Sequence, residues 1–155
     1  MSIESDLQRL KEWYWYNWSL CLFCNHDVRK HGDLAHLIRR SASRELQTLK
    51  LNTGLAHREC HDIFDNKPRE AIYLPRFFEC MYLIWKIDIQ YYGGLCFSYS
   101  QLGIYLPDFF LIDPHIPTLE HHGELLTLQP LLTLQDLMMP LLQGSPLLPV
   151  LQVGH

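Results

Sequence analysis

Residues 21–61 read CLFCNHDVRKHGDLAHLIRRSASRELQTLKLNTGLAHRECH, and the fold can be predicted from the cysteines and histidines spaced along them. It begins with a C-x2-C pair, Cys21 and Cys24, which we call the first knuckle. Near its end is an H-x2-C pair, His57 and Cys60, the second knuckle, and 32 residues lie between the two. Two ligands at this spacing fit on one tight turn, and two such pairs complete a tetrahedral zinc ion. The sequence therefore predicts a closed structural zinc site that joins the two ends of the region. Its ligands are expected to be Cys21, Cys24, His57 and Cys60.

The segment between the two pairs predicts a β-hairpin. Residues 33–38 alternate well enough to form a short strand, and residues 49–55 are its expected antiparallel partner. A polar loop, residues 39–47, joins the two. A helix should begin near Cys60 and end before Lys67-Pro68, since proline cannot continue a helix. The region is thus expected to fold as strand, strand and helix around one metal ion.

Four polar residues in and after the hairpin are candidates for chemistry. His36 lies in the first strand, and Asn52 follows sixteen residues later. His61 comes directly after the last knuckle cysteine, and Asp65 is four residues further on. Residues four apart share one face of a helix, so one imidazole and one carboxylate can bind a second divalent ion there. Such an ion keeps open positions for water and a phosphate oxygen.

These residues carry a family resemblance. The run CLFCNHDVRKHGDLAHLIRRS…LNTGLAHRECHDIFDN resembles the HNH endonucleases, which are ββα-metal nucleases of phages, restriction systems, bacterial toxins and mobile elements. His36, in the context AHLIRRS, matches the first motif histidine. Asn52 matches the motif asparagine, five residues before the second knuckle, and His61 matches the histidine after it. The resemblance covers residues 18–67, under a third of the chain.

The resemblance implies a mechanism of DNA hydrolysis. His36 would be the general base, and Asn52 would orient its imidazole or brace the hairpin. His61 and Asp65 would hold Mg²⁺ or another divalent ion that neutralises charge on the phosphorane and on the leaving 3′ oxygen. Backbone phosphates would be bound in the loop after the first strand by Arg39, Arg40 and Arg44.

Two positions depart from the family pattern. The residue before the motif histidine is often an Asp or His that binds the catalytic metal, and here it is Ala35. Asp33 or Asp65 would have to take over that role. The second knuckle begins with His57 in place of cysteine, which zinc accepts. The Ala35 departure leaves open a zinc-stabilised binding module that has lost catalysis. The apolar residues 95–155 leave open a structural or assembly protein that docks on a partner.

Charge divides the chain into two unequal parts. The net charge of −4 conceals that residues 1–86 hold all 13 Lys and Arg against 11 acids, whereas residues 87–155 hold six acids and no Lys or Arg. Any phosphate contact is therefore expected from the first part. There is no apolar run of 18 residues and no signal-like start, so the chain is expected to be cytoplasmic and without a membrane partner. The odd number of cysteines, five, argues against a disulfide framework.

The expected fold class is α+β. A small ββα-metal module, residues 19–67, is flanked by an N-terminal helix within residues 1–18 and a packing helix over residues 68–94, which Gly93-Gly94 closes. Residues 95–155 are expected to form an irregular, acidic and apolar extension rich in Leu and Pro. So many leucines favour a docking role, which predicts a homo-oligomer or a protein partner.

Overall fold

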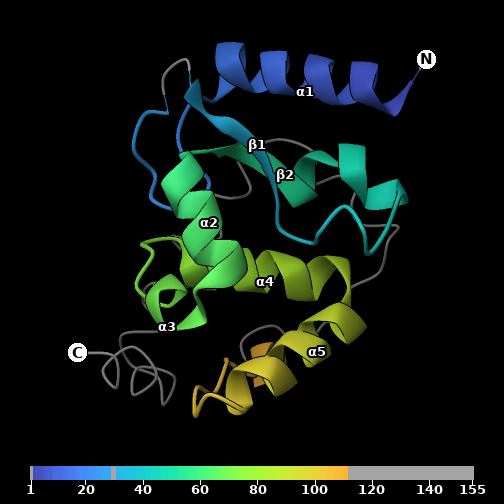
Figure 1. The fold of residues 1–155 in the computed structure, drawn as a ribbon. Coiled ribbons are helices and arrows are strands. Elements are labelled where there is room, and N and C mark those ends of the chain that lie inside the picture. Colours follow the sequence, from blue (N-terminus) through green and yellow to red (C-terminus); the bar gives the residue numbers. More distant parts are fainter. Residues whose placement is uncertain (1, 29–30, 112–155) are drawn as a thin grey trace.

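The computed structural model of the chain describes residues 2–28 and 31–111. It has a mixed α+β fold, in which a two-stranded antiparallel sheet lies between α1 (Ile3–Asn17) and the helices that follow the sheet (Figure 1). Leu7, Leu10 and Tyr14 are the buried residues of α1, and their spacing of three and four places them on one face. The Tyr14 hydroxyl lies 2.8 Å from the Lys50 carbonyl oxygen and 2.9 Å from that of Thr53, so α1 is anchored to the start of the second strand.

The hairpin expected from the sequence is present, with shorter strands. β1 (Asp33–His36) pairs antiparallel with β2 (Thr53–Ala56), and Asp33 faces Ala56 while His36 faces Thr53. The connection contains two short 3-10 helices, Glu45–Thr48 and Lys50–Asn52, where the sequence predicted the start of the second strand. The ladder stops after His36 because the Asn52 side chain, in place of a strand backbone, bonds the main chain of Ile38.

The helix expected near Cys60 begins slightly earlier. α2 (Arg58–Asn66) starts directly after His57 and ends at Asn66, with Lys67 as its C-cap. Pro68 then opens the short helix α3 (Pro68–Ala71). Proline at the first position of a helix loses no hydrogen bond, which explains why a new helix begins there. α2 crosses between the hairpin and the later helices in Figure 1, and it thereby carries His61 and Asp65 between the two parts of the fold.

The prediction of one packing helix over residues 68–94 is wrong. After the short α3, the structure has two further helices, α4 (Phe77–Ile87) and α5 (Ile89–Ser100), with a break at Asp88. Asp88 is extended, and its side chain accepts a hydrogen bond from Tyr91 N–H at 3.0 Å, which caps the start of α5. Gly93 and Gly94 lie inside α5, so the pair does not end a helix, and a Cβ added at either would meet no atom within 4 Å outside that helix's own backbone.

The expected extension from residue 95 is also corrected at its start. Residues 95–100 are helical, and a 3-10 helix follows at Phe109–Leu111. Phe109 is fully buried and packs with Tyr82, Trp85 and Tyr92, which closes the hydrophobic core around α4. The Leu/Pro-rich part, residues 112–155, lies outside the described residues. In the described ranges no helix is both long and apolar enough to cross a membrane.

Candidate metal centre and active site

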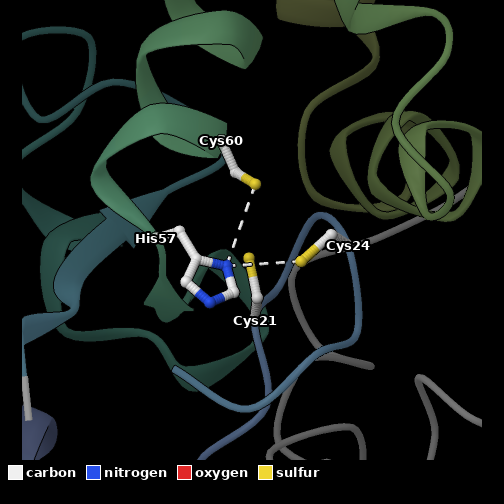
Figure 2. Close-up of side chains that lie close together, drawn as sticks. All are labelled: Cys21, Cys24, His57 and Cys60. Atoms are coloured by element: carbon white, nitrogen blue, oxygen red, sulfur yellow. Dashed lines mark hydrogen bonds between the residues drawn. The ribbon is translucent and has the colours of Figure 1, made fainter. Parts of the chain in front are cut away.

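Four side chains converge where the first knuckle meets the start of α2. One sulfur or nitrogen of each lies within 4.8 Å of one such atom of every other, and these side chains are Cys21, Cys24, His57 and Cys60. Figure 2 shows Cys21 and Cys24 reaching from the knuckle loop, and Cys60 from α2, towards the imidazole of His57. His57 Nδ1 lies 3.3 Å from the Cys24 sulfur and 3.9 Å from that of Cys60. These are the four residues that the spacing predicted to be ligands, and they lie close enough together to hold a metal ion.

The donor set fits a metal ion such as zinc. Four ligands at about 2.3 Å from one ion would lie about 3.7 Å apart, close to the spacing seen here. The other ring nitrogen of His57, Nε2, is 3.0 Å from the carbonyl oxygen of Asp27 and donates to it, so Nδ1 is left with its lone pair towards the sulfurs. Among the described residues, this is the one group of three or more Cys, His, Asp or Glu side chains close enough to share an ion.

The ionisation of the three thiols points to the same chemistry. Burial and the neighbouring thiolates raise the pKa of Cys60 to about 12, and burial with Cys21 also raises the pKa of Cys24. Burial also acts against ionisation of Cys21, but backbone N–H groups of Cys24, His57 and Phe23 outweigh it and lower its pKa. Three thiolates so close together repel one another unless a cation lies between them.

The knuckle loop is held from two sides. Leu22 N–H donates to the Leu55 carbonyl of β2 at 2.7 Å, and Arg76 N–H donates to the Phe23 carbonyl at 2.9 Å. Asn25 follows the second knuckle cysteine with a φ of 64°, a left-handed conformation that asparagine tolerates better than most residues. Its side-chain oxygen accepts a hydrogen bond from Arg76 Nη1 at 3.1 Å. The start of α4 therefore fixes the turn that presents the two cysteines.

Arg76 is the functional residue that the sequence analysis missed. Its side chain has no exposed area, and Nε and Nη2 both donate to one Glu79 carboxylate oxygen at 3.1 Å. A buried guanidinium needs such partners, because an unpaired charge in the interior is strongly destabilising. The signal in the sequence is weak: an Arg and a Glu three residues apart within an otherwise apolar segment.

His36 lies at the end of β1, and it is only 7% exposed. Its Nε2 donates to the Gln47 carbonyl oxygen at 2.8 Å, which leaves the lone pair of the neutral ring on Nδ1. Burial lowers the pKa of His36 below its usual value, and the charges of Arg40 and His61 lower it further. The imidazole is therefore a neutral acceptor at neutral pH, which is the state that a general base requires.

Asn52 is fully buried and braces the loop beside His36. Besides its two bonds with Ile38, its Nδ2 donates to the Leu46 carbonyl at 3.0 Å. The structure places no hydrogen bond between Asn52 and the His36 ring. Of the two roles expected for Asn52, the contacts are those of a brace for the hairpin.

His61 lies between two carboxylates. Its Nε2 is 3.1 Å from Asp65 on the same helix, and its Nδ1 is 3.6 Å from Asp33 of β1. The hydrogen bond with Asp65 raises the pKa of His61, and Asp33 adds to this effect. Because the carboxylates lie at opposite nitrogens, the three side chains do not surround one point. His61 Nε2 and Asp65 are the pair that suits a shared divalent ion, and Asp33 is placed to orient the ring.

Strand alternation explains the place of Asp33. Residues 33 and 35 share one face of β1, so Asp33 lies on the side of Ala35, which is itself fully buried. Phe23, between the two knuckle cysteines, stacks on Phe64 at 4.5 Å and lies nearly parallel to His61 at 6.4 Å between ring centroids. Phe23 thus lies between the two cysteines of the candidate metal cluster and also packs beside the site formed by His61, Asp65 and Asp33, which we call the histidine site.

The three loop arginines are all exposed but differ in their partners. Arg39 donates to the Asp65 carbonyl oxygen at 2.6 Å. Arg40 forms an ion pair with Glu4 of α1 at 2.8 Å. Within the described residues, the Arg44 side chain has no recorded hydrogen bond or ion pair, so of the three it is the arginine whose guanidinium is fully available to a phosphate.

The chain was compared with protein-family models, with curated proteins and with solved structures, and none of them matches it.

Proposed function

We propose that the chain is a metal-dependent HNH-type endonuclease that hydrolyses DNA phosphodiester bonds, with structural zinc at the Cys21, Cys24, His57 and Cys60 cluster. One observation carries the proposal. A neutral histidine, fixed through Nε2 to the Gln47 carbonyl, lies on a strand–strand–helix unit whose helix carries the His61–Asp65 pair. The charges of His61 and Asp65 both act on the pKa of His36, so the three side chains share one electrostatic environment.

The residues suggest how the reaction would proceed. His36 Nδ1 would take a proton from water as its oxygen attacks phosphorus, and the bond from phosphorus to the 3′ oxygen would break. A divalent ion held by His61 and Asp65 would supply positive charge against the phosphorane and the leaving oxygen. Asn52 would keep the His36 loop in place, and Asp33 would orient the His61 ring. Arg44 would bind a backbone phosphate.

A plasmid-nicking assay with Mg²⁺ or Mn²⁺ tests the proposal. The wild type is compared with His36→Ala and with the matched control His26→Ala, which changes an exposed histidine of the knuckle loop. We expect nicking by the wild type and the control, and a loss of at least about a hundredfold in His36→Ala. Equal activity of all three proteins, or activity in none, contradicts a catalytic role for His36.

The second candidate is a zinc-stabilised DNA-binding module without catalysis. It is favoured by Ala35, which is fully buried and offers no ligand where the family often has one. The same plasmid separates the candidates, because such a module would retard the DNA in a gel without nicking it, and His36→Ala would retard it equally.

A further inference from the structure

A groove of about 380 Å³ opens beside the histidine site, between α2, α4 and α5. Its size falls within the range of small-ligand sites in proteins. The wall is mostly apolar, with Phe64 of α2, Met81 of α4 and Leu95 of α5 among its lining residues. Arg39 and Asp65 line it as well, so the groove begins where the candidate active site ends.

The polar end of the groove is tied to the histidine site by two contacts. Arg39 Nη2 donates to the backbone carbonyl of Asp65, and the Asp65 carboxylate contacts His61 Nε2. A phosphate bound by the exposed guanidinium of Arg39 would therefore lie next to the reacting phosphodiester. The groove would then receive the nucleoside that is attached to this phosphate.

Three hydroxyl groups along α5 give the groove its polar character. Tyr91, Ser98 and Tyr99 line it, and among the described residues no hydrogen bond of their hydroxyls is recorded. Tyr99 is the most informative of them, since only 6% of it is exposed, and its ring packs against Phe77. Burial raises its pKa to about 12, so it remains a neutral donor. The Tyr99 hydroxyl itself reaches solvent, so it is available to the polar edge of a ligand in the groove.

The charges indicate which part of a nucleic acid would enter. From residue 87 onwards the chain has no Lys or Arg, so α5 cannot bind a second phosphate through a basic side chain. A flat ring with apolar faces and polar edges matches the aromatic wall and its hydroxyls, and this describes a nucleobase. A base within a paired duplex stays in its stack and does not reach such a groove, whereas an unpaired base reaches it at little cost.

We propose that this groove binds one unpaired nucleobase of the substrate while Arg39 holds the adjoining phosphate. The inference rests on the proposed nuclease function and names its substrate class: DNA with an unpaired nucleotide next to the cleaved bond. Such a protein would select bulged or single-stranded DNA over a fully paired duplex.

Fluorescence anisotropy of the full-length, zinc-loaded protein tests the proposal, with Ca²⁺ in place of Mg²⁺ to prevent cleavage. The probes are a fully paired labelled duplex and the same duplex with a one-nucleotide bulge. Leu95→Trp fills the groove, and Phe97→Trp is its matched control, since Phe97 is exposed on the same helix and does not line the groove. Tyr99→Phe removes the hydroxyl alone and is a milder change if Leu95→Trp disturbs the fold.

We expect the wild type and Phe97→Trp to bind the bulged duplex about tenfold more tightly than the paired one. Leu95→Trp should lose this preference while it keeps its affinity for the paired duplex, and Tyr99→Phe should reduce the preference severalfold. Equal binding of both duplexes by the wild type, or a preference that survives in Leu95→Trp, overturns the proposal. So does a wild-type dimer that Leu95→Trp dissociates in sedimentation, because a second copy would then occupy the groove.

The two proposals fail in different ways. A protein that nicks plasmid but has no bulge preference retains the nuclease function and loses the base-binding groove. A protein that prefers the bulged duplex but never cleaves it retains the groove and loses the nuclease function.

Discussion

Asn52 and Ile38 exchange two hydrogen bonds across the hairpin: Ile38 N–H donates to Asn52 Oδ1 at 2.7 Å, and Asn52 Nδ2 donates to the Ile38 carbonyl at 3.1 Å. The exchange copies the pairing of two strand backbones with a side chain in place of one of them. Asn52 also donates to the Leu46 carbonyl, so it holds the chain after β1 beside the 3-10 helix whose Gln47 carbonyl accepts the hydrogen bond from His36, the proposed base.

Asn52→Ala should therefore destabilise the protein by about 3 kcal/mol, because it leaves buried main-chain groups of Ile38 and Leu46 without partners. Urea unfolding measures the loss. Asn66→Ala is the control, since Asn66 is exposed and its side chain donates a hydrogen bond to Asp62 at the protein surface. A loss below about 1 kcal/mol for Asn52→Ala would show that the brace is unimportant.

Removal of one partner of the buried Arg76–Glu79 pair should be costly. Arg76→Met leaves the Glu79 carboxylate in the interior and releases Asn25, and we expect a loss of about 3 to 5 kcal/mol. Arg69→Met on α3 is the matched control, because Arg69 is exposed. Metal affinity provides a second readout, since the knuckle turn that Arg76 holds should bind zinc more weakly in the variant than in the wild type.

Chelation should lower the melting temperature of the wild type and release about one zinc ion per chain. In Cys60→Ser, which removes one ligand, the chelator should have little further effect because the site is already broken. Cys96→Ser, outside the cluster, should behave like the wild type. A wild-type melting curve that the chelator does not change would refute the metal site.

The pH dependence of cleavage follows from His36. Its pKa lies below the ordinary value of 6.5, so the ring stays neutral as pH falls from 8 to 6.5, and the cleavage rate should fall only below that range. The lowered pKa also makes the stability of the fold depend on pH. As pH falls, His36 takes up a proton near pH 6.5 in the unfolded chain, before it does so in the folded chain. The contribution of neutral His36 to the free energy of unfolding is therefore fully present above pH 6.5 and declines as pH falls below it. A rate profile with an apparent pKa above 7 would contradict this assignment.

Arg44 should contribute to DNA binding without sequence preference. Arg44→Ala is expected to weaken binding to any duplex and to reduce the slope of log affinity against log salt by about 1, as expected for one phosphate contact. Arg9→Ala on α1 serves as the control for loss of one positive charge elsewhere. Equal salt slopes for Arg44→Ala and the wild type would exclude a phosphate contact.

The site was easier to predict from sequence than the helices after it. The spacing of Cys21, Cys24, His57 and Cys60 is local and chemically restrictive, so it predicted a cluster that the fold brings together. The hairpin also followed from alternation, but its length depended on the Asn52 side chain, a contact between distant residues. The break at Asp88 was missed because apolar residues lie on both sides of it, so the pattern of apolar residues appears continuous. The capping hydrogen bond from Tyr91 N–H to Asp88 has no counterpart in that pattern.

The contacts of Arg76 could not be predicted from sequence for a different reason. Its partners are Glu79, three residues away, and Asn25 in the first knuckle, 51 residues earlier in the chain. No local pattern reveals the second contact. The groove beside α5 was equally hidden, since its lining residues come from four helices and from the chain after β1, and no single segment specifies how these pack.

A metal ion bound by the four-residue cluster would also close the chain between the two knuckles into a ring. An ion shared by Cys21 and Cys60 would cross-link positions about 40 residues apart, which in the unfolded state removes conformational freedom worth roughly 4 kcal/mol by the chain-entropy estimate. His36, Asn52 and the arginine loop all lie inside that ring. Because the entropy of a ring changes only slowly with its length, residues could be added to or removed from the arginine loop at small cost to stability. The length of the loop that would face DNA could thus vary at little cost to stability. His36 and Asn52 would keep their positions, because the hairpin and a bound metal ion would hold them.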